Sequence, residues 1–251
     1  MTKRADIIWL GEVDSTNSEA RRHISDIDNL SVVSALSQSQ GRGQMGNTWS
    51  SAPGENLTFS IVMKPEGLNA IRARDQFVLS EAAALTIVEF LSGHDIQAEI
   101  KWPNDIYVGN RKICGMLIEN SLRGDTISHS IIGIGLNVNQ RNFDINLPNP
   151  TSMAILSGIG TDIRKALEEI TDTFRSICET MLASSEGRTR LRSLYLSRLW
   201  RLDEEHSYVE TATGKAFTGT IKGVSPTGRL LIETADGSLK EFAFKEISYI
   251  I

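Results

Sequence analysis

A helix predicted over residues 72–91 places the strongest constraint on the fold of this chain. Its apolar positions recur with a helical period and form a face of Phe77, Leu79, Ala84, Leu85 and Val88. A helical face this apolar must be buried against another layer of structure, and a sheet can provide that layer. Runs rich in β-branched and aromatic residues predict strands at residues 6–10, 31–36, 57–62, 96–102, 106–108, 112–119 and 127–138. The sequence therefore predicts a long helix packed on a sheet.

Local signals also mark the ends of several elements. Helices are predicted at residues 15–24, 162–183 and 188–200. Ser15 or Thr16 can cap the first of these helices and Asp162 the second, because short polar side chains accept hydrogen bonds from a free helix N-terminus. The pair Gly109 and Asn110 between two predicted strands indicates a two-residue β-hairpin.

The C-terminal segment differs in character from the rest of the chain. Residues 207–251 read as short strands separated by turns at residues 213–214, 226–228 and 236–237. About 50 residues of this kind are typical of a small β-barrel. We therefore expect one domain over residues 1–200 and a small β domain over residues 201–251.

The composition is that of a folded protein with a slightly acidic surface. Hydrophobic residues make up 40% of the 251 positions and charged residues 23%, far from the regime of disordered chains. The net charge of −5 disfavours electrostatic binding to nucleic acid, because such binding neutralises phosphates with a basic surface. The four arginines of the helix at residues 188–200 are expected to form a solvated face; they are Arg188, Arg190, Arg192 and Arg198.

The sequence gives no sign of a membrane partner or of a secreted protein. No apolar run approaches the roughly 20 residues that cross a bilayer, and the N-terminal segment turns acidic after one short strand-like stretch. Cys114 and Cys178 lie far apart, and the four histidines show no ligand spacing with them. We therefore expect a cytoplasmic protein with neither a disulfide framework nor a Cys/His zinc site.

Residues 38–55 are the most unusual stretch of the chain. They contain four glycines together with Arg42 and Trp49, and they show neither a helical nor a strand period. Loops of this length without structure of their own are uncommon in compact domains, where they usually serve function. A plain linker would not carry an arginine and a tryptophan among its glycines, so we interpret this segment as a ligand-binding loop.

Part of this loop fits a dinucleotide-binding pattern, but its context does not. Residues 41–46 read GRGQMG, which matches the G-x-G-x-x-G spacing. That pattern functions at the start of a helix, whereas residues 47–54 contain proline, glycine and three hydroxyl residues and predict no helix. We therefore reject a dinucleotide site. A glycine loop with an arginine can still enclose an anion through its backbone N–H groups and the guanidinium.

A second group of polar residues follows the strand predicted at residues 96–102. Asn104 and Asp105 come directly after it, where an aspartate can accept from a ribose or hold Mg²⁺, while Lys112 follows the hairpin turn and Gly115 permits a close approach. Taken singly, these residues also fit an ordinary turn and a solvated lysine. Together with the glycine loop, and without a Ser/His/Asp or Cys/His arrangement, they favour ATP binding and charge stabilisation at phosphorus.

Several segments in register identify a family. The chain contains DSTN, GRGQMGNTWSSAPGENLTFS, KWPNDIYVGNRKICGMLIE and IGIGLNVN in that order, and it thereby resembles the biotin protein ligases. The resemblance covers about residues 6–190, and the β-rich tail looks like that family's SH3-like C-terminal domain. It implies an α/β (α+β) fold with a mixed β-sheet catalytic domain of the biotin/lipoate ligase type.

The resemblance also implies a two-step activity. In the first step the biotin carboxylate attacks the α-phosphate of ATP, with Mg²⁺, and gives biotinyl-5′-AMP and pyrophosphate. In the second step a lysine of a biotin carboxyl carrier domain takes the biotinyl group. Both steps would make the chain an ATP-dependent ligase whose partners are biotin, ATP and a carrier domain of a biotin-dependent carboxylase.

Site residues carry over position by position. The resemblance places biotin against Ser15, Thr16, Asn17, Gln38, Arg42, Gly43, Gln44, Lys112 and Gly115. The hydroxyl and amide groups among them suit a ureido ring, which needs both donors and acceptors. It places ATP and the adenylate against Trp49, Asn104, Asp105, Lys112 and Asn137. Lys112 and Arg42 take the catalytic roles, and Asp105 is the position implied for Mg²⁺.

The loop departs from the family pattern at three positions. Many members place arginines where this chain has Gln44 and Met45, and a basic residue where it has Asn47. Fewer cations in this loop therefore face the phosphate than in those members.

Two other functions share parts of this pattern. Some biotin ligases resemble repressors with an N-terminal winged helix, but the catalytic resemblance begins by Asp14 and leaves no room for such a module, so no nucleic-acid partner is expected. A lipoate ligase or octanoyl transferase shares the domain architecture, although the loop and the KWPND segment look like the biotin branch. The expected state is a monomer or weak homodimer, in which an exposed edge such as residues 127–138 could pair with a second copy or with the carrier.

Overall fold

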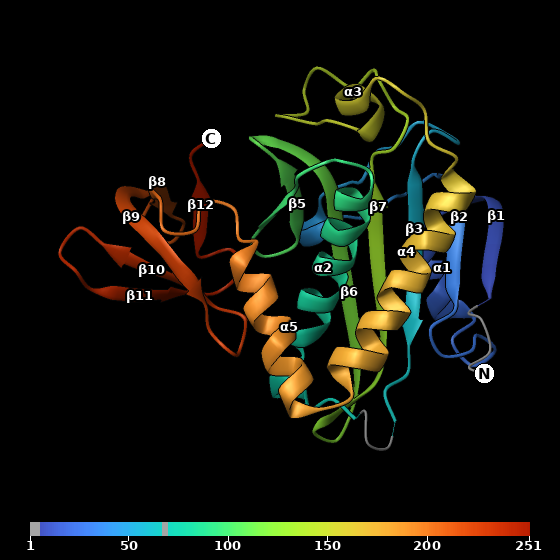
Figure 1. The fold of residues 1–251 in the computed structure, drawn as a ribbon, viewed down its shortest axis with the longest axis horizontal. Coiled ribbons are helices and arrows are strands. Elements are labelled where there is room, and N and C mark those ends of the chain that lie inside the picture. The colour runs from blue at the N-terminus through green and yellow to red at the C-terminus, as the bar shows by residue number, and fades with distance from the viewer. Residues whose placement is uncertain (1–5, 67–69) are drawn as a thin grey trace.

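The structure, a computed structural model, describes residues 6–66 and 70–251 as a large layered part and a small β part (Figure 1). The first five residues of the expected N-terminal domain thus lie outside the described residues. The strands of the large sheet are β1 Ile7–Val13, β2 Val32–Gln38, β3 Leu57–Met63, β4 Glu99–Lys101, β5 Asp105–Val108, β6 Arg111–Arg123 and β7 Thr126–Leu136. The strands of the small sheet are β8 Glu205–Glu210, β9 Lys215–Val224, β10 Leu230–Thr234, β11 Leu239–Phe242 and β12 Ile247–Tyr249.

The large sheet is mixed, as the expected fold class requires. Its seven strands run in the order β1-β2-β3-β7-β6-β5-β4, with β1 and β2 parallel and the other neighbours antiparallel. The small sheet has five antiparallel strands in the order β11-β10-β9-β8-β12. The fold class predicted from the sequence is therefore confirmed, with a separate C-terminal β part.

Helices cover the large sheet unequally. They are α1 Thr16–Arg22, α2 Phe77–Gly93, α3 Met153–Ser157, α4 Ile163–Ile177 and α5 Ser185–Ser197, and a π-helical turn, Cys178–Leu182, follows α4. Figure 1 shows α2, α4 and α5 on the near side of the sheet and α1 behind it. Among the described residues, the short helix α1 is the helix that lies on the far side of the sheet.

The long predicted helix is the centre of the core. It begins at Phe77, because Ala73–Asp75 forms a 3₁₀ turn ahead of it, and nearly all of its apolar side chains are buried. One expectation needs correction here, since the stretch Ala73–Gly93 has the length and composition of a membrane span. About 72% of its most apolar window is buried inside the protein, so the core accounts for this apolarity.

The predicted helix caps and the predicted hairpin turn are confirmed. The Ser15 hydroxyl accepts from the backbone N–H of Ser18 at 3.2 Å and caps α1, and the Asp162 carboxylate accepts from the first turn of α4. Gly109, with φ of 57°, makes the tight turn between β5 and β6. These features follow from short-range chemistry and needed no knowledge of the tertiary fold.

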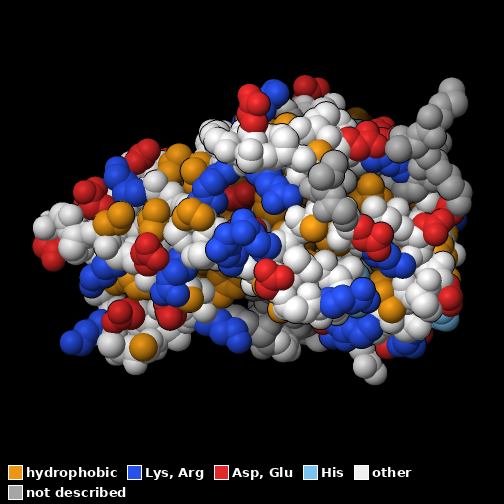
Figure 2. Space-filling view, turned by 90° about the horizontal axis from the view of Figure 1, so that it is seen from below, with side chains coloured by type: hydrophobic (Ala, Val, Ile, Leu, Met, Phe, Trp, Pro, Cys, Tyr) orange, Lys and Arg blue, Asp and Glu red, His pale blue; other side chains and the backbone are white. Residues whose placement is uncertain are grey.

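Two expectations about the surface are wrong. The strand predicted at residues 127–138 is no exposed edge, because β7 lies between β3 and β6, and the edges of the large sheet are β1 and β4. Arg192 is not part of a solvated face, because its guanidinium forms an ion pair of 2.7 Å with the buried Glu81 of α2. Seen from below, the molecule carries basic and acidic side chains intermixed with apolar atoms (Figure 2).

The small β part packs firmly against the large one. The indole N–H of Trp102 donates to the carbonyl of Gly228 at 2.9 Å, and the rings of Phe77 and Trp102 both contact Phe244. Arg192, besides its pair with Glu81, donates to the carbonyl of Val224 in β9. The C-terminal β part is therefore held against Trp102, α2 and α5 by both apolar and polar contacts.

The buried pair at this junction should make stability depend on pH. Burial raises the pKa of Glu81 to about 7 from 4.5, against the opposing charge of Arg192. A raised carboxyl pKa means that ionisation costs more in the folded than in the unfolded chain, so stability from this group falls as pH rises from about 5 to about 8. As pH rises over this range, the melting temperature of the parent protein should therefore fall relative to that of Glu81→Gln.

The measurement is thermal unfolding of both proteins at about one-unit steps of pH. A difference between the two midpoints that stays constant, or that shifts in favour of the parent as pH rises, would contradict this account of Glu81.

Candidate active site

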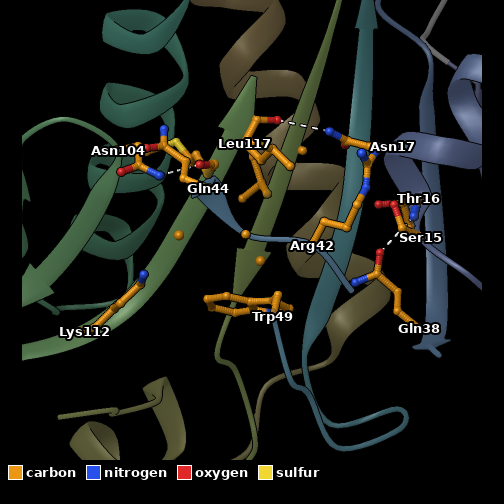
Figure 3. A pocket seen from close by; sticks show the side chains of 16 residues that line it. Ser15, Thr16, Asn17, Gln38, Arg42, Gln44, Trp49, Asn104, Lys112 and Leu117 are labelled. Atoms are coloured by element: carbon orange, nitrogen blue, oxygen red, sulfur yellow. Dashed lines mark hydrogen bonds between the residues drawn. The ribbon is translucent and has the colours of Figure 1, made fainter. Parts of the chain in front are cut away.

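A cavity on the α1 side of the large sheet collects most of the residues predicted to bind ligands (Figure 3). The N-terminal end of α1, the end of β2 and the glycine loop form one side, and β6 and β7 form its floor. The predicted residues that line it are Ser15, Thr16, Asn17, Gln38, Arg42, Gly43, Gln44, Trp49, Asn104, Lys112 and Gly115. Chain positions 15 and 115 thus meet at one site, as the resemblance implies.

One wall of the cavity is polar but uncharged. The backbone N–H of Thr16 donates to the side-chain oxygen of Gln38 at 2.8 Å, which joins the start of α1 to the end of β2. The buried Ser60 hydroxyl lies 2.8 Å from Thr16 Oγ1 and 2.6 Å from Asn17 Oδ1. These contacts fix the amide and hydroxyl groups in a buried layer, where they present donors and acceptors to a neutral polar ligand.

The floor depends on glycine at facing strand positions. Gly115 of β6 pairs with Gly135 of β7, and an added Cβ at Gly135 would lie 2.2 Å from the indole ring of Trp49. A Cβ at Gly133 would lie 2.2 Å from Asn17 Oδ1. Side chains at these positions would therefore displace the groups that approach the sheet from above.

The glycine loop has a definite conformation. Gly43 N–H donates to the carbonyl of Asn47 at 2.7 Å around a 3₁₀ turn at Gln44–Gly46, and Trp49 N–H donates to the carbonyl of Gly41 at 2.9 Å. The loop therefore folds back on itself as a small hairpin, although its sequence shows no periodic pattern.

The end of the loop is anchored in a buried amide network. Asn56 Nδ2 donates to Gln140 Oε1 at 2.5 Å, and the backbone N–H of Ala52 donates to the same oxygen at 3.1 Å. The C-terminal end of the loop is therefore fixed to the buried residues Asn56 and Gln140.

Both cations at the cavity are held by carboxylates. Lys112 Nζ lies 2.7 Å from Asp105 and 5.8 Å from the centre of the Trp49 ring, while Arg42 lies 3.1 Å from Glu119 of β6. Each cation is therefore placed beside the cavity before a ligand arrives, which suits the binding of an anionic group.

The cavity is too small in this conformation for a cofactor-sized ligand. It holds about 60 Å³, whereas ligand sites commonly measure about 300–1,000 Å³. The indole of Trp49 fills the space above Gly115 and Gly135, and its buried N–H lacks a hydrogen-bond partner among the described residues. Trp49 must therefore move to admit a larger ligand.

The remaining predicted residues lie close by but outside the lining. Asp105 contacts the site through Lys112, and Asn137 donates its amide to the carbonyl of Thr151 at 2.9 Å. A second cavity of about 180 Å³ adjoins the first at Asn104 and extends to Phe244 of the small β part. The roles of Asp105 and Asn137 stay predictions from the resemblance.

Neither cysteine chemistry nor a ready-made metal centre is found at the site. Both thiols are free and buried, and burial raises the pKa of Cys178 to about 12 and that of Cys114 further. Within residues 6–66 and 70–251, His, Cys, Asp and Glu form no group of three that could hold a metal ion. Asp105 is thus a single candidate ligand for Mg²⁺, and no further acid supports it in such a group.

Sequence reasoning missed three residues of the site. Gly133 and Gly135 bring Asn17 and Trp49 onto the sheet, and Glu119 holds Arg42. The alternation of glycine with isoleucine in the strand at residues 131–135 was a usable signal, because glycines two apart lie on one face of a strand. No local pattern distinguishes Glu119 from other strand-end acids.

Comparisons with known proteins match both the large part and the small β part of the chain. The biotin/lipoate A/B protein ligase family matches residues 10–137, and the biotin protein ligase C terminal domain matches residues 209–248. The biotin protein ligase from Aquifex aeolicus, solved in complex with biotin and ATP, has a TM-score of 0.79 and 28% identity, with 97% of each chain covered.

Curated relatives include proteins with one and with two named activities. The biotin–[acetyl-CoA-carboxylase] ligase of Paracoccus denitrificans is 28% identical over 91% of this chain and 94% of its own length. The bifunctional ligase/repressor BirA of Bacillus spizizenii is 30% identical over 84% of this chain. The match spans only 64% of that relative's length.

The glycine floor predicts a specific effect of adding one methyl group. Gly135→Ala should drive the Trp49 indole off the sheet, because the new Cβ would overlap the ring. Trp49 fluorescence, isolated by comparison with Trp49→Phe, should shift to longer wavelength and become more accessible to acrylamide. Gly11→Ala is the matched control, because a Cβ at that strand position meets nothing within 4 Å.

Unchanged Trp49 emission in a folded Gly135→Ala protein would show that the indole does not lie on the glycine pair.

Proposed function

This chain belongs to the biotin/lipoate A/B protein ligase family, and from that premise we propose that it is an ATP-dependent biotin protein ligase. It would activate biotin as biotinyl-5′-AMP and transfer the biotinyl group to a lysine of a biotin carboxyl carrier domain. One observation carries the proposal: a neutral polar wall and two cations meet at a single cavity beside a tryptophan.

The two ends of the cavity suit the two ends of biotin. Thr16, Asn17 and Gln38 offer amide and hydroxyl groups of both kinds, and a ureido ring needs donors and acceptors together. Lys112 lies on the far side of the cavity from this wall, whereas Arg42 lies beside Asn17 and Thr16 (Figure 3). The biotin carboxylate and the ATP α-phosphate would meet between the two cations. Biotin is neutral at its ureido end and anionic at its carboxylate end, which suits a cavity with neutral polar groups on one side and Lys112 on the other.

In the first step a carboxylate oxygen of biotin attacks the α-phosphorus of ATP. A new P–O bond forms while the bond to the β-phosphate breaks, and pyrophosphate leaves with the electron pair. Two anions must come together, so the protein's task is to orient them and to offset the charge that builds on the α-phosphate. Lys112 and Arg42 supply this charge, and the backbone N–H groups of the glycine loop assist.

In the second step the acceptor lysine attacks the biotinyl carbonyl. An amide bond forms, AMP leaves with the bonding electrons, and the attacking amine loses a proton.

Trp49 would act as a platform for the adenine, because an aromatic face stacks on a base. In that role its indole would leave the glycine floor.

ATP brings most of the ligands that Mg²⁺ needs. This ion is usually held by one or two carboxylates together with substrate phosphates, and Asp105 is the carboxylate that pairs with Lys112. When bound, Mg²⁺ would supply further positive charge to the phosphates. Asp105 would then have to share its carboxylate with Lys112, so we expect the ion to enter with ATP.

The proposal includes a cytoplasmic location, a monomer or weak homodimer, and no nucleic-acid or membrane partner. Two buried free thiols suit a reducing compartment.

A lipoate ligase is the nearest alternative within the family. The polar wall favours biotin, because an aliphatic dithiolane ring makes no use of paired amide donors and acceptors.

Substrate-dependent pyrophosphate release tests the proposal. With ATP and Mg²⁺, the protein should release pyrophosphate when biotin is present and should not when lipoate replaces it. Release with lipoate alone would assign the chain to the lipoate branch, and release with neither would refute an adenylation activity.

Lys112 should be essential for the first step. Removing one preorganised charge donor typically costs roughly 10²- to 10³-fold in rate, so Lys112→Ala should slow adenylate formation by about that factor while the fold persists. Lys112→Arg should recover only part of the rate, because a planar guanidinium does not replace a compact ammonium. Lys215→Ala, an exposed lysine of β9, is the matched control.

Adenylate formation at the parent rate by folded Lys112→Ala protein would remove Lys112 from the mechanism and leave Arg42 as the main cation.

A further inference from the structure

Glu119 joins the three parts of the protein that enclose the cavity. It lies on β6, on the face that carries Gly115, and its carboxylate is half-buried. It accepts from Asn17 Nδ2 of α1 at 2.8 Å, pairs with Arg21 of α1 at 2.6 Å, and pairs with Arg42 of the glycine loop at 3.1 Å. One carboxylate thus connects the sheet, the helix and the loop.

We propose that Glu119 is a positioning residue that holds Asn17 and the glycine loop in the arrangement that binds biotin. The inference rests on the proposed function for the identity of the ligand, whereas the contacts themselves do not depend on it. Glu119 is not among the residues that line the cavity, so it acts through its neighbours.

The carboxylate determines which way the Asn17 amide faces. Asn17 Nδ2 donates to Glu119 and to the carbonyl of Leu117 at 3.2 Å, which leaves Oδ1 beside the Ser60 hydroxyl. A flipped amide would place its NH₂ group at Ser60 and its oxygen against the Glu119 carboxylate, where two acceptors would repel. Glu119 therefore fixes the donor and acceptor pattern of the polar wall.

The same carboxylate restrains the loop. Arg42 Nη2 and Nη1 lie 3.1 Å and 3.4 Å from the two oxygens of Glu119, a fork-like contact that ties one arm of the loop to the floor. Gly43 and Gln44, which follow Arg42, line the cavity. Without this contact the guanidinium would turn to solvent, and the glycine backbone would lose its placement over the cavity.

Glu119 remains charged in this environment. Partial burial alone would raise its pKa, but the hydrogen bonds from Arg21 and Asn17 and the two guanidinium charges outweigh burial and lower the pKa. The ion pairs therefore persist at neutral pH, and they link two arginines that would otherwise repel each other.

The first test needs no ligand. Chymotrypsin cleavage next to Trp49 reports how often the loop opens, and Glu119→Gln should raise that rate about tenfold, because a charge-assisted contact to the loop is lost. Asp75→Asn is the matched control, since Asp75 also pairs with two arginines, Arg72 and Arg74, away from the loop. Equal cleavage of the Glu119→Gln and parent proteins would overturn the proposal.

Two further measurements separate positioning from a purely structural role. Glu119→Gln should raise KM for biotin about tenfold or more while kcat changes little, because uniform binding is lost but no reacting group is removed. The double variant Glu119→Gln with Arg42→Gln should be cleaved no faster than Arg42→Gln alone, because both changes break the same contact. Additive effects of the two substitutions on the cleavage rate, or a loss of kcat with unchanged KM in Glu119→Gln, would contradict the positioning role of Glu119.

The outcomes also separate this inference from the proposed function. If biotin proves not to be the substrate, the cleavage tests still decide whether Glu119 holds the loop. If Glu119→Gln protein does not fold, Arg42→Gln breaks the pair from the loop side and must speed cleavage relative to Asp75→Asn. Failure to do so would overturn the proposal.

Discussion

The cavity on the α1 side of the sheet exists because three of the strand positions that face it are glycines. Gly115 and Gly135 pair across β6 and β7, and Gly133 lies two residues away on the same face. Helix α1 and the glycine loop can therefore approach the backbone of the sheet directly, and Asn17 and Trp49 occupy the space a methyl group would need. The opposite face of the same strands carries the large apolar side chains that pack beneath α2.

Each of the two cations at this floor is paired with a carboxylate. Lys112 begins in a pair with Asp105 and Arg42 in a pair with Glu119. Partly exposed pairs of this kind contribute little to stability, so an anionic ligand can replace a carboxylate at small cost. In our account Lys112 moves toward the phosphate, whereas Glu119 keeps Arg42 near the floor. The two pairs would thus serve different purposes at one site.

The sequence predicts those parts of the fold that depend on neighbouring residues. The Ser15 and Asp162 caps and the Gly109 turn are local, and each is confirmed. Contacts between distant segments were not accessible. The burial of Arg192 against Glu81 and the central place of β7 depend on how strands and helices are arranged in space. The motifs placed most of the site residues through the family resemblance, but Glu119 became visible only when Asn17 and Arg42 were seen to converge on it.

The central claim is that this cavity joins biotin to a protein lysine at the expense of ATP. The most direct measurement is the intact mass of a biotin carboxyl carrier domain after incubation with the protein and biotin. The account predicts a gain of one biotinyl group that requires ATP and is lost when the acceptor lysine is replaced by arginine. A carrier mass that is unchanged with ATP, or that changes equally without it, would contradict the account.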